Sequence, residues 1–310
     1  MTSGPADLDR RARSVIEALD RIDGAAWNEA ERSGRVDLVE LMGRVCADQH
    51  GLEPLVPPST GARGRWRHER GDRWRSLPDL TEADRAMLDF AQQFAVDVSA
   101  ITDGQRSSVF DRWGDQAATM VAVLFAMDVL PRARAALHAL DPALDPGAVQ
   151  ADLADVRIWD ALDGLIRAVP RLDALDPVTS ELVRLRVARQ HRCRLCQSLR
   201  SRPAVLAGAD EPFLVDLDDY ERSDLSPHRK AALAMTDAML WTPARVGPAA
   251  DRLRRHASLP QCVEVVADLT RNALNKIAVS LGADAPHVEE GIEIYDVDSD
   301  GEILYGLTID

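Results

Sequence analysis

Apolar residues recur every three or four positions along most of this chain, the spacing that places them on one face of an α-helix. One series runs through Leu80, Ala83, Met87, Phe90, Ala91 and Phe94, and another through Val263, Val266, Leu269, Ala273 and Ile277. The alternating pattern of strands is scarce, and its best candidates are Glu293-Ile294-Tyr295 and Ile303-Leu304-Tyr305. The pattern therefore predicts an all-α fold.

The helical pattern occurs twice along the chain. The segment that begins Asp79-Leu80-Thr81-Glu82 matches the one that begins Asp224-Leu225-Ser226-Pro227 at an offset of 145, over about forty-five residues. Upstream the match weakens, and with a one-residue shift the stretch 48–52 faces Cys193 to Cys196. We expect two tandem helical copies, residues 1–145 and 146–290, followed by a C-terminal tail, residues 291–310.

Capping and turn residues divide the pattern into elements. Thr81 and Ser226 stand where helix N-caps belong, and Pro227 suits the first position of a helix. Two prolines and a glycine in 140–147 predict the joint between the copies. The stretch 54–75 is rich in Pro, Gly, Arg and Trp, and two interpretations stay open: an ordered loop over a cleft or a mobile excursion.

Composition limits the class of protein. The 310 residues are 46% hydrophobic and carry a formal net charge of −14, which predicts a globular protein with no general affinity for nucleic acid. Neither an apolar secretory run near Met1 nor a stretch suited to crossing a membrane is visible, so we expect a cytoplasmic location and no membrane partner. No flavin, haem or nicotinamide signature is visible, and we expect no cofactor.

The candidate chemistry lies in Cys193-Arg194-Leu195-Cys196, because two thiols three positions apart can form and break a disulfide. Seven arginines surround the pair between Glu181 and Arg202, and nearby positive charge favours the reactive thiolate. They are Arg184, Arg186, Arg189, Arg192, Arg194, Arg200 and Arg202. The other two cysteines, Cys46 and Cys262, are expected to be small buried residues. The sequence thus predicts a redox-active dithiol.

Helical geometry brings further polar residues to the dithiol. At about 100° per residue, Glu181, Arg192, Cys196 and Arg200 fall on one side of a helix. If the helix instead breaks and restarts just before the cysteines, Cys193 lies near a helix N-terminus. Either arrangement favours thiol activation, and Glu181 is then a candidate to relay a proton.

The motif resembles a known family at this point. Glu181, eleven intervening residues and Cys193-x-x-Cys196, with Leu185-Arg186-Val187-Ala188 between them, are similar to the core motif of the alkylhydroperoxidase D and carboxymuconolactone decarboxylase family. The resemblance covers roughly 175–282 and, in degenerate form without the cysteines, much of the first copy. It implies two alkylhydroperoxidase D-like domains that assemble into a homo-oligomer.

The resemblance also implies roles for individual residues. It gives Cys196 as the thiol that attacks a peroxide, Cys193 as the resolving thiol and Glu181 as the relay carboxylate. Where the family's peroxidases have histidines, this chain has Leu195 and Arg200. Arg200 stays protonated, so it can stabilise a thiolate or bind an anion but cannot shuttle a proton. His191 is either the replacement base or an exposed histidine at a helix end.

The residues leave three functions open. The first is a thiol oxidoreductase that acts on a peroxide or disulfide and is reopened by an external dithiol reductant. The second is a cofactor-free lyase, in which Arg200 holds a small carboxylic acid and Glu181 or His191 moves protons. The third is a non-enzymatic module whose arginine face binds an acidic partner.

Several other residues carry open alternatives. Zinc would need two more ligands besides the two cysteines, and no second close pair of Cys or His is present in the sequence. Asn272 and Asn275 either bond across helices or line a pocket. Asp268 stands in an apolar stretch, and we expect it to pair with an arginine, with a role in the pocket as the alternative.

Overall fold

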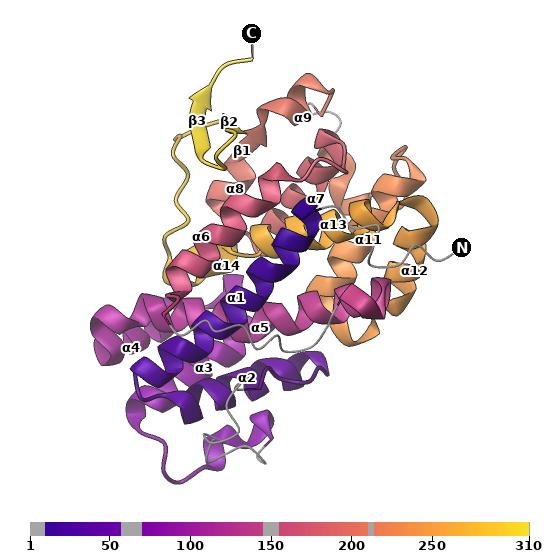
Figure 1. Cartoon of the computed structure of the whole chain (residues 1–310). Coiled ribbons are helices and arrows are strands. Elements are labelled where there is room, and N and C mark those ends of the chain that lie inside the picture. Colours follow the sequence, from indigo (N-terminus) through magenta and orange to yellow (C-terminus); the bar gives the residue numbers. More distant parts are fainter. Residues whose placement is uncertain (1–9, 57–69, 145–154, 210–213, 310) are drawn as a thin grey trace.

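The computed structural model describes residues 10–56, 70–144, 155–209 and 214–309 (Figure 1). The first half contains α1 (Arg10–Arg32), α2 (Val36–His50), α3 (Glu82–Val96), α4 (Asp103–Trp113) and α5 (Ala117–Leu140). The second half contains α6 (Ile158–Ala168), α7 (Pro177–Gln190), α8 (Arg194–Ser198), α9 (Arg202–Leu206), α11 (Pro227–Trp241), α12 (Gly247–His256), α13 (Leu259–Asn272) and α14 (Asn275–Leu281). The prediction of a mostly helical fold is confirmed.

One small sheet accompanies the helices. Its order is β1-β2-β3, where β1 (Leu199–Ser201) pairs parallel with β2 (Glu293–Val297), and β2 pairs antiparallel with β3 (Ile303–Leu307). The two strand candidates near the C-terminus are therefore confirmed. They form a hairpin beside α8 and α9, at the top of the view in Figure 1. The segment expected as a C-terminal tail, 291–310, is therefore part of the structure around the cysteines, because its strand β2 pairs with β1.

Local signals fix the two equivalent helices as the sequence predicts. The Thr81 hydroxyl accepts the N–H of Asp84, whose carboxylate accepts the N–H of Thr81 in return, so α3 begins with a capping box. Ser226 accepts the N–H of Arg229, and Pro227 is the first residue of α11. Both predicted N-caps are confirmed.

The element boundaries fit the internal repeat. Both α3 and α11 begin and end 145 positions apart, and the 3₁₀ helices Val98–Ala100 and Pro243–Arg245 do the same. The joint expected in 140–147 begins where α5 ends and continues through the 3₁₀ helix Pro142–Leu144, while its residues 145–147 lie outside the described ranges. Of the irregular stretch 54–75, residues 57–69 also lie outside them, while the 3₁₀ helix Gly71–Ser76 packs on α2.

Upstream of the repeat, helix ends define a register that the sequence comparison missed. Helix α2 ends at His50 and is followed by Gly51 with φ 65°, while α7 is followed by His191 and Arg192 with φ 51°. The two histidines are 141 positions apart, as are Glu40 and Glu181. In this register Cys193 aligns with Leu52 rather than with the stretch 48–52 as a whole. The offset of 145 found downstream does not hold here, because the segment that follows the helix differs in length between the halves.

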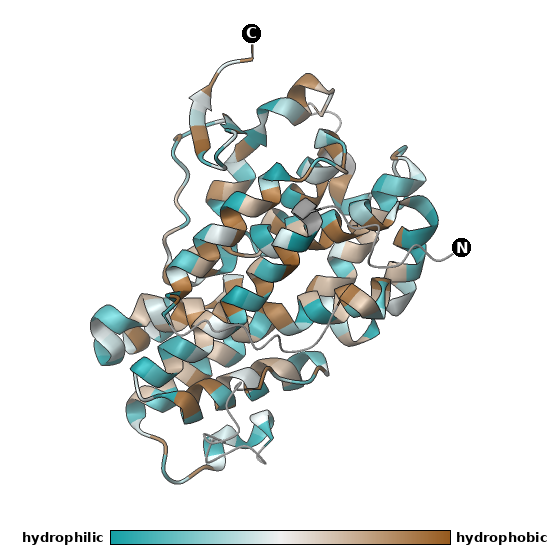
Figure 2. Ribbon diagram, in the orientation of Figure 1, coloured by the Kyte–Doolittle hydropathy of each residue, from teal (hydrophilic) through white to brown (hydrophobic). Residues whose placement is uncertain are grey.

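Both halves contribute to one hydrophobic core. Helix α1 packs on α6, and α5 packs on α2 as well as on α13 and α12 of the second half. The largest fully buried side chains, Trp27, Phe90, Phe94 and Phe125 among them, come from the first half. Figure 2 shows apolar and polar residues interspersed along most helices, as amphipathic helices require. Within the described residues, no helix is both long enough and apolar enough to cross a bilayer.

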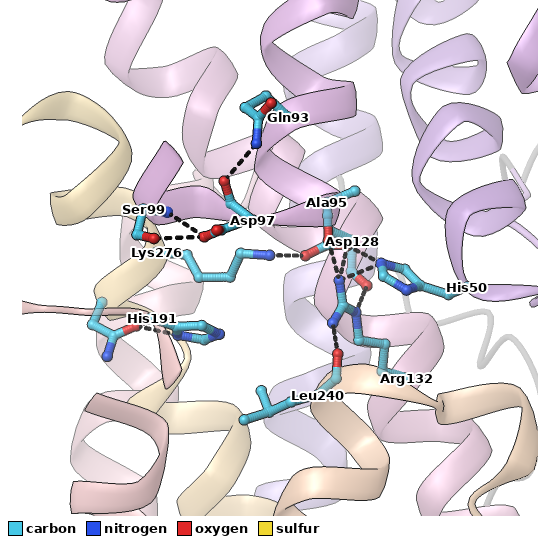
Figure 3. A network of polar contacts seen from close by, with 11 residues as sticks. His50, Gln93, Ala95, Asp97, Ser99, Asp128, Arg132, His191, Leu240 and Lys276 are labelled. Atoms are coloured by element: carbon cyan, nitrogen blue, oxygen red, sulfur yellow. Dashed lines mark hydrogen bonds and ion pairs between the residues drawn. The ribbon is translucent and has the colours of Figure 1, made fainter. Parts of the chain in front are cut away.

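Buried charges lie where the halves meet (Figure 3). The Asp128 carboxylate on α5 accepts Arg132 Nη2 at 2.5 Å and Lys276 Nζ, from α14, at 2.6 Å. His50 Nε2 lies 3.3 Å from the same carboxylate. Burial opposes ionisation of Asp128, but the two cations outweigh it and hold the pKa of Asp128 far below its usual range. Burial lowers the pKa of Lys276 to about 8 even with Asp128 beside it.

The same arginine joins the two equivalent helices. Arg132 donates to the carbonyls of Ala95 on α3, at 3.3 Å, and Leu240 on α11, at 2.7 Å. These carbonyls are 145 positions apart and lie in the last turn of their helices, where backbone acceptors lack partners within the helix. The Arg132 guanidinium therefore provides hydrogen bonds to equivalent carbonyls at the helix ends of both halves.

Replacing Asp128 with asparagine should destabilise the protein by about 3–5 kcal/mol, because Arg132 and Lys276 stay buried without their counter-charge. Lys276→Met should cost less, since Arg132 still neutralises Asp128 and methionine fills the space of the lysine stem. Urea unfolding followed by circular dichroism measures both. An Asp128→Asn variant as stable as the wild type would contradict a role for this carboxylate in holding the halves together.

Candidate functional site

The chain reverses between α7 and α8, and the cysteines lie directly after the reversal. Arg192 is exposed and has φ 51°, the only left-handed residue other than glycine within the described ranges. Cys193 then caps the five-residue helix α8, and its Sγ accepts the N–H of Cys196 at 3.2 Å. The helix thus breaks and restarts before the motif, which is the second of the two arrangements that the sequence allows.

Cys193 and Cys196 are joined by a disulfide, with their Cα atoms 5.3 Å apart. Cys193 is only 1% exposed, whereas Cys196 is partly buried. Cys46 and Cys262 are free and buried, as expected. Solvent therefore reaches the pair from the side of Cys196.

The disulfide lies in the wall of a pocket of about 350 Å³. Apolar side chains form much of this wall: Ile166, Leu195, Leu199, Leu274, Ala278 and Ile303. Tyr295 and Tyr305 come from the C-terminal hairpin, and Arg184, Arg271, Asn272 and Asn275 are the polar members. The hairpin is held there because β1, which starts three residues after Cys196, pairs Ser201 with Tyr295 of β2. Two segments distant in sequence thus enclose the sulfurs.

Glu181 forms a buried ion pair beneath the motif. Its carboxylate accepts Arg184 Nε at 2.6 Å and Nη2 at 2.8 Å, and it also accepts the N–H of Ser201 at 3.3 Å. Arg184 donates in addition to the carbonyls of Cys196, at 2.7 Å, and Leu199, at 2.6 Å. Burial would lower the pKa of Arg184, but Glu181 raises it instead. The pair therefore anchors both ends of the segment from Cys196 to Ser201.

His191 is buried, so the interpretation as an exposed histidine at a helix end is wrong. Its Nδ1 lies 2.6 Å from Oδ1 of Asn275, which in turn lines the disulfide pocket. Burial, together with the nearby charge of Lys276, lowers the pKa of His191 to about 3. The ring is therefore neutral at physiological pH. Figure 3 shows it on the Lys276 side of the buried charges.

Arg200 takes no part in the wall of the disulfide pocket as far as the described residues define it. Its side chain is buried, and Nη1 donates to the carbonyls of Gln197 and Leu199, both at 2.7 Å. The helical wheel placed it beside Cys196 because it assumed one continuous helix. The chain enters β1 at Leu199 instead, which turns Arg200 toward the backbone.

Carboxylates cancel much of the positive charge that the sequence places beside the cysteines. Besides Arg184, three more of the seven arginines form ion pairs: Arg186 with Asp237 and Asp218, Arg189 with Asp218, and Arg194 with Asp284. These acids are distant in sequence, so the local excess of arginine overstated the field at the sulfurs. The positively charged surface that could bind an acidic partner is therefore weaker than the sequence indicates.

A smaller acidic pocket of about 190 Å³ adjoins the first one and shares Arg184, Arg271, Asn272 and Tyr295 with it. Glu181, Glu264 and Asp268 line it. Burial raises the pKa of Glu264 to about 7 and that of Asp268 to about 6. Among the described residues, Oδ2 of Asp268 has no hydrogen-bond partner and no arginine forms an ion pair with this carboxylate, contrary to expectation.

The structure brings some predicted site residues together and separates others. Cys193 and Cys196 share one pocket, Glu181 lies in the adjoining one behind Arg184, His191 reaches the sulfurs only through Asn275, and Arg200 lies apart. Asn275 combines the two roles left open for it, and Asn272 lines the pocket. The sequence pattern did not predict the ion pair between Glu181 and Arg184, or the place of Tyr295 and Tyr305 in the pocket wall. In the described ranges, no group of three or more His, Cys, Asp or Glu is placed to hold a metal ion.

Two proteins of Mycobacterium tuberculosis, one from strain CDC 1551 / Oshkosh and one from strain H37Rv, are similar to this chain. Each is named as an uncharacterized protein and is 43% identical over 235 residues, which span 72% of this chain and 81% of the relative. No family model matches the chain. No solved structure matches it either.

The His191 ring should stay neutral when the pH is lowered from about 8 to 5, and its ¹H and ¹⁵N NMR signals should not titrate there. The unfolded state takes up a proton near pH 6.5, whereas the folded state does so only near 3, so stability falls as the pH drops between these values. At about pH 4.5 the loss from this residue is about 3 kcal/mol. His191→Gln should lack that part of the loss, and an ordinary titration near pH 6.5 would contradict the burial.

Proposed function

We propose that this chain, which belongs to the same family as the two uncharacterized mycobacterial proteins, is a thiol oxidoreductase that cycles between the Cys193–Cys196 dithiol and its disulfide. The observation that carries the proposal is the asymmetry of the pair. Both cysteines line the pocket, but Cys196 is the more exposed residue, whereas Cys193 is only 1% exposed and lies within bonding distance of it. An attacking and a resolving thiol need this arrangement.

Oxidation of the dithiol starts at Cys196. Its thiolate attacks the terminal oxygen of a hydroperoxide, the O–O bond breaks, and an alkoxide leaves to take a proton from water. Cys196 becomes a sulfenic acid, which Cys193 attacks through its thiolate to form the disulfide with loss of hydroxide. The N–H of Cys196, which points at Cys193 Sγ, stabilises the negative charge of the resolving thiolate.

An external dithiol completes the cycle. One of its thiolates attacks the disulfide at Cys196, the more exposed sulfur, and releases the Cys193 thiolate. The second thiol of the reductant then attacks the mixed disulfide, so that Cys196 leaves reduced and the reductant is oxidised. The apolar pocket wall favours a reductant or peroxide with an organic group over a small hydrophilic one.

Glu181 supports the cycle through Arg184. Both carboxylate oxygens are occupied by Arg184 and the Ser201 N–H, so a proton relay through Glu181 would have to pass this ion pair. Within the pair, Arg184 donates a hydrogen bond to the carbonyl of Cys196. This contact restricts the orientation of the attacking sulfur. Glu181 is therefore proposed as a positioning residue as well as a candidate relay.

The lyase alternative is less well supported by the geometry. It needs a guanidinium in the pocket to bind a carboxylate, and Arg200 donates to backbone carbonyls instead. Arg271, which lines both pockets, would have to take that role. Turnover that survives loss of both thiols would favour this reaction over the redox cycle.

Thiol counting tests the redox proposal. The chain has four cysteines, and the fully reduced protein should lose two thiols after one equivalent of an organic hydroperoxide. Cys196→Ser should lose none, whereas Cys193→Ser should stop at a sulfenic acid that a dimedone probe labels. The matched control, with Cys46 and Cys262 both replaced by Ser, should lose the same two thiols as the wild type. Retention of all four thiols in the wild type would sink the proposal.

A further inference from the structure

Within the part of the chain that the structure describes, Asn275 carries a side-chain donor without a partner, beside the disulfide pocket. It is the first residue of α14, it is 9% exposed, and it lines the same pocket as both cysteines. Among the described residues, its side-chain Nδ2 is buried and has no hydrogen-bond partner. A buried amide without a partner costs free energy, so the group needs an explanation, and at a pocket wall a ligand that completes the hydrogen bond is one.

The orientation of the amide is set from behind. His191 Nδ1 lies 2.6 Å from Oδ1 of Asn275, and a neutral ring in the Nδ1–H form donates to that oxygen. The His191 donor therefore holds Oδ1 in place and leaves Nδ2 without a partner within the described residues. His191 comes from the end of α7, two residues before Cys193, so the reversal that places the cysteines also places this ring.

Asn272, one turn earlier, provides a contrast. It lines the same pocket, but its Nδ2 already donates to the carbonyl of Asp268 at 2.7 Å. The two side chains therefore share their chemistry and their pocket, and differ in whether the amide N–H groups are committed within the protein.

We propose that Asn275 is a catalytic residue whose Nδ2 donates a hydrogen bond to the oxygen that leaves when Cys196 attacks a hydroperoxide, and that His191 is the positioning residue that holds the amide. The inference rests on the proposed function. As the O–O bond breaks, the bond electrons stay with the leaving oxygen as an alkoxide. A fixed donor in the largely apolar pocket stabilises that charge without reorganisation.

The leaving group provides the test. An alkyl hydroperoxide expels an alkoxide, in which the charge sits on one oxygen, whereas a peracid expels a carboxylate that delocalises it. Asn275→Leu should lower the second-order rate constant for tert-butyl hydroperoxide about 100-fold. For peracetic acid the loss should be below about tenfold, because a carboxylate gains less from the donor. Stopped-flow fluorescence or rapid-quench thiol counting measures both rates.

Matched variants separate this role from a packing defect. Asn272→Leu should change both rate constants by the same factor, whatever its size. Asn275→Asp, close in shape to asparagine, replaces the donor by an acceptor and should show at least the loss of Asn275→Leu for the alkyl hydroperoxide. His191→Phe frees the amide to rotate and should give a smaller loss with the same preference between oxidants.

The outcomes distinguish this inference from the proposed function. A wild-type protein that forms no disulfide with either oxidant overturns both. If the wild type reacts but Asn275→Leu slows both oxidants equally, or neither, the role of Asn275 is overturned and the dithiol cycle stands. A His191 ring protonated at Nε2 rather than Nδ1, read from ¹⁵N shifts, would overturn the orientation on which the donor depends.

Discussion

The fold depends on one buried carboxylate that neutralises charge between its two halves. Asp128 accepts hydrogen bonds from Arg132 of its own helix and from Lys276 of the second half, and Arg132 also donates to carbonyls at matching helix ends. Since each cation would be costly alone, the charges constrain how α5, α14, α3 and α11 approach one another. Asn275 directly precedes Lys276, so the wall of the disulfide pocket is fixed by the same constraint.

A second ion pair, between Glu181 and Arg184, fixes the backbone beside the cysteines. Arg184 holds Glu181 on one side and the carbonyls after the motif on the other, which ties the reversal after α7 to the first strand. The Arg184 guanidinium, which lines the disulfide pocket, thus holds the backbone in place. Reactivity in the account above comes from exposure, from local N–H donors and from an uncommitted amide, and owes little to a general excess of arginine.

The sequence predicted what depends on local chemistry. Periodicity identified the helices, Thr81 and Ser226 marked helix starts, and alternation found the two C-terminal strands, though not their pairing. It could not predict β1, because a three-residue strand has no pattern of its own and its partner begins 94 positions later. The acids that neutralise the arginines, and the burial of His191, likewise depend on packing between distant segments. The relation of the two halves as copies of one family domain stays a prediction.

The most direct measurement of the central claim is the midpoint potential of the Cys193–Cys196 couple, from thiol labelling across a series of glutathione or dithiothreitol redox buffers. A pair that cycles in catalysis should titrate between roughly −180 and −300 mV, within reach of cellular dithiols. Cys196→Ser should remove the transition, while replacing Cys46 and Cys262 should leave it in place. A potential well below about −300 mV is typical of structural disulfides and would contradict the account.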